Sequence, residues 1–178
     1  MNATDIIAAL EPFVEALEAL QVPYQIGGSV ASSAQGLPRA TLDVDLVADV
    51  RPSHVAPLVE RLEDRYYIDG DMIRQAIRAH TSFNIIHLDT ALKIDVFAIK
   101  PGAYDLTSFQ RRYQGTLGDA PDSTFFYLAS PEDVILNKLE WYRKGGGVSD
   151  RQWQDILGIM RVQGQRLDRA YPGCRCSG

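Results

Sequence analysis

The spacing of apolar residues predicts helices and short strands in alternation. Apolar residues recur at helical spacing over 6–20, where Pro12 predicts a break or kink. A short strand, "YQI" at 24–26, precedes the glycine pair 27–28 and a helix of small residues that Gly36 ends. The first predicted unit is therefore strand, turn, helix.

Segment 41–50, "TLDVDLVADV", alternates between two faces. Val44 and Leu46 point to one face, whereas Asp43 and Asp45 point to the other. This pattern is typical of a half-buried strand. Carboxylates two residues apart on a strand lie roughly 6 to 7 Å apart at their Cα atoms, so both can contact one metal ion.

Residues 52–99 contain a third candidate aspartate within a predicted hairpin. This residue, Asp95, shares its strand face with Lys93. If this strand lies beside the one that carries Asp43 and Asp45, three carboxylates converge. The expected elements are a helix over 52–62, a short strand over 66–68, a helix over 71–80 capped by Asp69 or Asp71, and hairpin strands over 82–88 and 92–99.

The last third of the chain has a strong helix start. Ser130 is placed as N-cap with Pro131 at the first helical position, followed by acidic residues. The segment "GGGVSD" predicts a hinge before a further amphipathic helix. We expect an α/β core over 1–128 and a C-terminal helical part over 129–178.

The composition of the chain argues against several classes of protein. The 178 residues are 46% hydrophobic and 23% charged, as in soluble globular proteins, and no apolar run approaches the ~20 residues of a membrane span. The N-terminus lacks the basic region of a secretory signal, so the cytoplasm is expected. A net charge of -5 argues against coating duplex DNA. The cysteines, Cys174 and Cys176, cannot complete a four-ligand zinc site alone.

The carboxylates and glycines together point to phosphate chemistry. A cluster of carboxylates repels itself unless cations are present, and oxygen ligands without histidine or thiolate favour Mg²⁺ or Mn²⁺. Gly27 and Gly28 allow close approach to a ligand, and Ser29 opens a helix whose N–H groups favour anions. A triphosphate fits there, with Arg39 and Lys138 as the candidate cations.

Simpler interpretations exist for the same residues. Asp43 and Asp45 can be the charged, solvent-facing side of an edge strand, although their match with Ser29 and Asp95 favours metal binding. The glycine pair can be an ordinary turn before a helix. Lys138 can be an exposed lysine that pairs with a neighbour such as Glu140, and this interpretation stays open.

The motif set resembles that of a known superfamily. "GGS", followed after thirteen residues by "DVDL", with "IDVF" on a later strand, resembles the polymerase-beta nucleotidyltransferases. Through Arg39 and Thr41, "GGSVASSAQGLPRATLDVDLV" is similar to the opening motif of AbiEii-type toxins and minimal nucleotidyltransferases. "SPEDVILNKLEWYRKGGGVSDRQWQDILGIM" resembles their C-terminal helical motifs. The resemblance covers most of residues 5–165.

The resemblance implies a fold, an activity and residue roles. The fold is α+β, with a mixed β-sheet nucleotidyltransferase core flanked by helices. The activity is metal-dependent transfer of a nucleoside monophosphate from an NTP to a hydroxyl. Asp43 and Asp45 ligate metal, Asp95 ligates the catalytic metal and helps to deprotonate the acceptor, and Lys138 faces the nucleotide.

The acceptor is open at this stage. The leading hypothesis is a macromolecule, a tRNA 3′ end or a protein hydroxyl, modified by the toxin of a toxin–antitoxin pair with a cognate antitoxin as partner. The alternatives are a small molecule such as an antibiotic, and a non-catalytic nucleotide-binding module. The tail "RLDRAYPGCRCSG" departs from the family, which implies a site edge that is incomplete or supplied by another chain.

Overall fold

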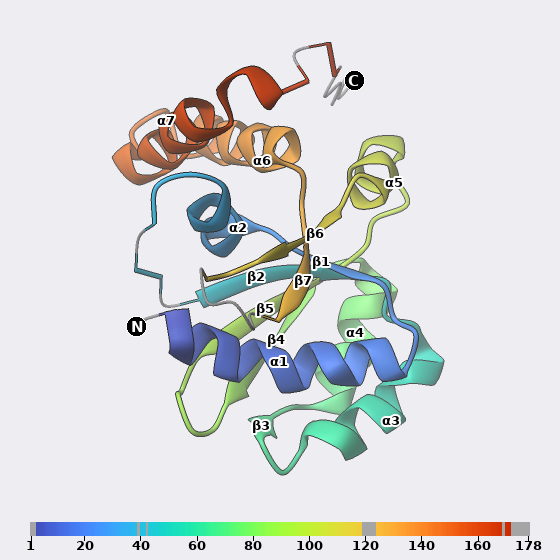
Figure 1. The fold of residues 1–178 in the computed structure, drawn as a ribbon. Helices are drawn as coiled ribbons and strands as arrows, with labels where there is room; N and C mark the ends of the chain where they lie inside the picture. The colour runs from blue at the N-terminus through green and yellow to red at the C-terminus, as the bar shows by residue number, and fades with distance from the viewer. Residues whose placement is uncertain (1–2, 39, 42, 119–123, 169, 172–178) are drawn as a thin grey trace.

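A mixed β-sheet runs through the middle of the molecule, with helices on both faces (Figure 1). The computed structural model describes residues 3–38, 40–41, 43–118, 124–168 and 170–171. No described helix is long and apolar enough to cross a bilayer. In chain order the elements are α1 (Ala3–Ala19), β1 (Tyr24–Ile26), α2 (Gly28–Gln35), β2 (Asp43–Ala48), α3 (Pro52–Leu62), β3 (Tyr66–Tyr67), α4 (Gly70–Ala79), β4 (Ser82–His87), β5 (Lys93–Ala98), α5 (Ala103–Gln110), β6 (Tyr113–Thr116), β7 (Phe125–Leu128), α6 (Pro131–Lys144), α7 (Asp150–Gln163) and the 3₁₀ turn Gly164–Arg166.

The sheet confirms the predicted α+β fold class. Its seven strands follow the order β3-β4-β5-β2-β1-β7-β6. Two neighbouring pairs are parallel, β2 with β5 and β1 with β7. The other pairs are antiparallel, including the predicted β4–β5 hairpin. Parallel neighbours need long connections, and so β2 and β5 come together only after α3, β3, α4 and β4 have been placed.

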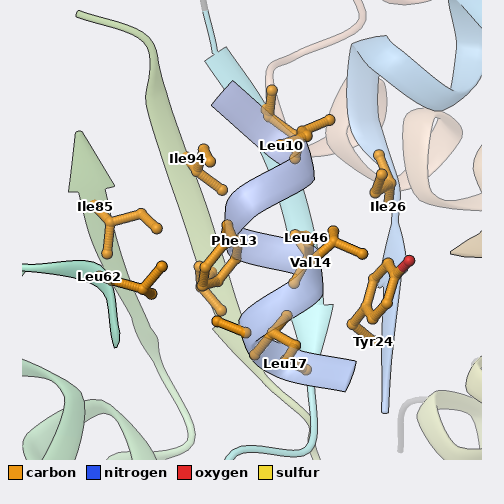
Figure 2. Close-up of a cluster of buried hydrophobic side chains, with 14 of the residues drawn as sticks. Leu10, Phe13, Val14, Leu17, Tyr24, Ile26, Leu46, Leu62, Ile85 and Ile94 are labelled. Carbon is orange, nitrogen blue, oxygen red and sulfur yellow. The ribbon is translucent and has the colours of Figure 1, made fainter. Parts of the chain in front are cut away.

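The main core lies between the sheet and the layer formed by α1, α3 and α4 (Figure 1). Leu10, Phe13 and Leu17 of α1 lie over Leu46 of β2 and Ile94 of β5 (Figure 2), and all five are fully buried. Each such side chain contributes about 1.5–3 kcal/mol of transfer free energy. The alternation along β2 is therefore fixed, because its Val44–Leu46 face must meet this layer.

Of the break or kink predicted at Pro12, the break is wrong, because α1 runs without interruption from Ala3 to Ala19; a kink stays a prediction. Proline removes one backbone hydrogen bond, the one that would reach the carbonyl of Ala8. Ala8 is exposed, so water can reach that part of the helix. Leu10 before the proline and Phe13 and Leu17 after it are all buried in the core, and these contacts hold both sides of the proline in one helix.

The predicted helix starts are borne out. The Ser130 hydroxyl accepts the N–H of Asp133 at 3.2 Å at the start of α6. Of the two candidates for α4, Asp69 is the cap, since its carboxylate accepts the N–H groups of Asp71 and Met72. Such caps satisfy backbone donors that the first helical turn leaves unpaired.

The other face of the sheet carries α2, with α6 and α7 stacked on it (Figure 1). A small second cluster joins these helices through Ala31, Val134 and Ile159. The small residues of α2 allow this close approach. At its end, a Cβ on Gly36 would lie 2.8 Å from the backbone nitrogen of Ile159. The division into parts at residue 128 stays a prediction.

We expect Gly36→Ala to lower the free energy of unfolding by about 1–3 kcal/mol, because the new methyl group overlaps the α7 backbone, which cannot move without repacking. Gly70→Ala is the matched control. At Gly70 the nearest obstacle is the flexible end of Arg74 at 3.3 Å, so that variant should be neutral or slightly stabilised. Urea unfolding of both variants checks this, and equal stabilities would show that α2 and α7 are not tightly apposed.

Candidate functional site

The register of β2 on β5 brings the predicted aspartates together. Asp45 lies directly opposite Asp95, and Asp43 lies opposite Lys93. All four side chains alternate with core residues and therefore point to the sheet face that carries α2. Asp43 is exposed, whereas Asp45 and Asp95 are partly buried. The condition for convergence, that the two strands are neighbours, is met.

The glycine pair places the start of α2 against Asp45. The Gly27 N–H donates to the Asp45 carbonyl at 2.8 Å. Gly28 has φ +55°, and a Cβ there would lie 1.9 Å from Asp45 Oδ2. A side chain at this position would overlap the carboxylate and would also strain the backbone. Gly28 is thus a contact residue of the carboxylate cluster, which is a more specific role than an ordinary turn.

Ser29 lies in the first turn of α2, immediately after this contact, and is partly buried. The N-cap of α2 is Gly27, which supplies no side-chain acceptor to the first N–H groups. These groups and the positive end of the helix lie beside the Asp45 carboxylate, as the predicted phosphate cradle requires. The roles of Gly27, Gly28 and Ser29 in binding a nucleotide stay predictions.

The negative charges of the neighbouring carboxylates act on Asp45. The pKa of Asp45 is raised above its ordinary value, first by burial and then by the negative charges of Asp43 and Asp95. The positive charges of Lys138 and Lys93 act in the opposite direction. The cluster therefore carries more negative charge than its lysines neutralise, which is the situation in which carboxylates bind cations.

Lys93 is a site residue that the sequence analysis did not select. Its Nζ lies 2.6 Å from Asp95 Oδ2. This bond to Asp95 is the main reason that the pKa of Lys93 is raised. The signal was present in the sequence, because Lys93 stands two residues before Asp95 on the same strand face.

Lys138 is buried rather than exposed. Its Nζ lies 2.7 Å from Asp155 Oδ2 and 3.3 Å from the Gln152 side-chain oxygen, both on α7. The interpretation of Lys138 as an exposed lysine paired with Glu140 is wrong, since Glu140 pairs with Lys144. Its charge lowers the pKa of Asp45, so it acts on the cluster. A direct contact of Lys138 with the nucleotide stays a prediction.

Of Arg39, Thr41 and the two cysteines, the structure describes Thr41. Arg39 lies outside the described residues, as do Cys174 and Cys176. Thr41, part of the motif resemblance, is buried, and its hydroxyl donates to the carbonyl of Asp43 at 3.0 Å and to its Oδ1 at 3.3 Å. Thr41 therefore orients the first aspartate.

The donor set fits a hard divalent cation. The three aspartates offer only carboxylate oxygens, the ligands that Mg²⁺ and Mn²⁺ prefer. Over the described ranges, no three His, Cys, Asp or Glu side chains already surround a metal position. In the arrangement seen, Thr41 engages Asp43 and Lys93 engages Asp95. A cation would compete with these contacts.

Comparison with known proteins shows which solved structures share this fold. No family model matches the chain, and neither does any curated protein. Among solved structures, that of the antibiotic-resistance factor ANT(2'')-Ia superposes with a TM-score of 0.61 at 15% identity, covering 93% of this chain and 88% of that one. Its complex with adenylyl-2''-tobramycin gives 0.59 at 15% identity, with 90% of each chain covered.

Two further nucleotidyltransferase structures agree. The lincosamide antibiotic adenylyltransferase LnuA, lincomycin-bound, gives a TM-score of 0.52 at 13% identity, covering 87% of this chain and 96% of that one. An antigenic nucleotidyltransferase-like protein from Paracoccidioides brasiliensis gives 0.55 at 21% identity, covering 88% and 75%. The nucleotidyltransferase fold implied by the sequence resemblance is therefore confirmed. The AbiEii-type branch stays a prediction.

We expect Gly28→Ala to lower the free energy of unfolding by about 2 kcal/mol or more, because a left-handed backbone and an overlap with Asp45 add together. Gly27→Ala is the matched control. Its φ is -121°, and the nearest atom to a new Cβ is the Asp45 carbonyl oxygen at 4.0 Å. Denaturant unfolding should show a much smaller loss for Gly27→Ala. A similar loss in both would mean that Gly28 does not contact Asp45.

The raised pKa of Asp45 predicts a pH-dependent cost of folding. In the unfolded chain Asp45 ionises near 3.8, whereas in the folded protein ionisation is harder. Stability is therefore lost as pH rises above the unfolded value. Metal-free Asp45→Asn should be more stable than wild type near neutral pH, and this difference should shrink below about pH 4. Urea titrations in EDTA at both pH values test it, and a stabilisation independent of pH would contradict the electrostatic cause.

Proposed function

We propose that this protein transfers a nucleoside monophosphate from an NTP to a hydroxyl acceptor, with a divalent cation held by Asp43, Asp45 and Asp95. The observation that carries the proposal is the β2–β5 register, which sets Asp45 beside Asp95 and next to the start of α2. This arrangement lies on a nucleotidyltransferase fold. The two strands provide carboxylates that would bind cations, and the start of α2 provides N–H groups that would bind phosphates.

The reaction exchanges one phosphorus–oxygen bond for another. The acceptor oxygen forms a bond to the α-phosphorus, the bond from that phosphorus to the pyrophosphate oxygen breaks, and the acceptor proton leaves. Bound Mg²⁺ or Mn²⁺ lowers the pKa of the attacking hydroxyl and neutralises charge on the leaving group. In this proposal Asp95 accepts that proton.

The remaining residues bind and orient the triphosphate. In this proposal the first N–H groups of α2, at Gly28 and Ser29, bind phosphate oxygens, and the Ser29 hydroxyl donates to one of them. Arg39 and Lys138 complete the cradle as cations. Lys138 contributes its charge from within the Asp155 ion pair, so its position depends on α7.

The acceptor we propose is a macromolecule, a tRNA 3′ end or a protein hydroxyl. In this proposal the protein is a cytoplasmic toxin with a cognate antitoxin. Support comes from the AbiEii-type resemblance of the "GGS…DVDL" segment and of the later helices. The acidic net charge of -5 accords with an acceptor other than duplex DNA.

A small-molecule acceptor is the second candidate. Two of the similar structures are antibiotic-modifying proteins or carry an antibiotic, ANT(2'')-Ia with adenylyl-2''-tobramycin and LnuA with lincomycin. The transfer chemistry would be identical, and only the acceptor pocket would differ. A non-catalytic nucleotide-binding module is less well supported, because the three aspartates are all present on adjacent strands.

The first experiment measures transfer from α-labelled ATP, GTP, CTP or UTP, with Mg²⁺, to total RNA, protein extract, the protein itself and aminoglycosides. Wild type should label one acceptor class. Asp95→Asn should lower the rate about 100-fold or more, because a metal ligand and proton acceptor is lost. Asp71→Asn is the matched control, since Asp71 is exposed and pairs with the neighbouring Arg74 on α4.

The outcomes separate the candidates. Label on RNA or protein supports the toxin proposal, and label on an aminoglycoside supports the small-molecule alternative. Equal rates for wild type and Asp95→Asn would remove the proposed site. Nucleotide binding without any transfer would favour the non-catalytic module.

A further inference from the structure

Four charged side chains lie side by side on β2 and β5. Asp43 and Asp45 face Lys93 and Asp95 across the parallel strand pair. Within this group Lys93 Nζ binds Asp95 Oδ2 at 2.6 Å. The same carboxylate is the one assigned to the catalytic cation in the proposed function. The Asp95 carboxylate therefore has two positive partners, Lys93 and the proposed cation.

We propose that Lys93 is a built-in counter-ion that occupies Asp95 in the metal-free protein and is displaced when the divalent cation binds. This inference rests on the proposed function. An ammonium and a divalent cation repel each other, so both cannot lie close to one carboxylate at low cost. Lys93 thus holds the carboxylates together before loading, and it sets how tightly the cation binds.

The surroundings of Lys93 permit this displacement. Its side chain is 44% exposed, on a flexible four-carbon stem. Its position is opposite Asp43, the exposed member of the cluster, so a second carboxylate lies within the same strand pair. Because Asp43 is itself a proposed ligand of the cation, the ammonium released from Asp95 would turn to solvent or to a phosphate oxygen of the substrate.

Lys138 shows the opposite arrangement and cannot take this role. Its side chain and that of Asp155 are each 5% exposed, and Gln152 also binds its ammonium. Removing Lys138 from this pair would leave a buried charge without its partner, which is costly. The two lysines that act on Asp45 are therefore a fixed charge on α6 and a movable one on β5.

The test measures Mn²⁺ affinity of the whole protein without nucleotide, by electron paramagnetic resonance of free Mn²⁺. Lys93→Met should tighten Mn²⁺ binding by about tenfold, because one competing charge is removed. Lys93→Arg should retain the wild-type affinity. Lys144→Met is the matched control for net charge, since Lys144 is exposed and pairs with Glu140 on α6.

A second readout follows the metal-free protein. In EDTA, Lys93→Met should lower the Tm, because the carboxylates lose their counter-ion. The same substitution in an Asp95→Asn background should have a smaller effect, since the pair is already broken. Together these two readouts describe an ammonium that stabilises the empty site and weakens metal binding.

Tighter Mn²⁺ binding in Lys93→Met, with the affinities of Lys93→Arg and Lys144→Met unchanged, supports the inference. Unchanged or weaker binding in Lys93→Met, with wild type binding Mn²⁺, overturns it and leaves the proposed function intact. An equal gain in Lys144→Met shows a general charge effect and also overturns it. No Mn²⁺ binding in wild type or in Lys93→Met overturns the inference, whereas the metal-dependent function is decided by the transfer assay, in which the triphosphate can supply further ligands.

Discussion

The pairing of β2 with β5 is the constraint on which the rest of the structure depends. It sets Asp45 opposite Asp95 on one face, and on the other face it sets Leu46 opposite Val96. Because side chains alternate along a strand, a slip of one residue would move the aspartates of β2 into the apolar layer under α1. The core therefore enforces the register that the carboxylates need. Packing on one face of the sheet determines the chemistry on the other.

Two ion pairs of different kinds offset part of the negative charge of the site. Lys93 and Asp95 form a partly exposed pair within one strand, whereas Lys138 and Asp155 form a buried pair between two helices. Exposed pairs contribute little to stability, and buried pairs repay their desolvation only with good geometry. These two pairs matter for where they place charge more than for the stability they add. They place positive charge around carboxylates that would otherwise repel one another.

Helix α2 connects this cluster to the C-terminal helices. Its first residue, Gly28, lies against the Asp45 carboxylate, and Gly36 just beyond its end lies against the α7 backbone. Both contacts require that a side chain be absent. Close approach thus explains the glycines at the two ends of α2.

Local features could be predicted from the sequence because they depend on residues a few positions apart. The strand Tyr24–Ile26, the helix Pro52–Leu62, the caps Asp69 and Ser130, and the shared face of Asp43 and Asp45 follow from alternation, helical spacing and capping chemistry. The uninterrupted α1 did not follow, since burial against the sheet outweighs one lost hydrogen bond at Pro12.

Tertiary structure decided the rest. The pairing of Asp45 with Asp95 joins positions fifty residues apart, and the partner of Lys138 proved to be Asp155, on another helix, instead of its neighbour Glu140. Such partners are selected by packing over the whole domain, which local patterns do not encode. The sequence by itself determined which chemical groups are present and which face each occupies. Only the folded chain decided which of them meet, because charges interact through space and not along the chain.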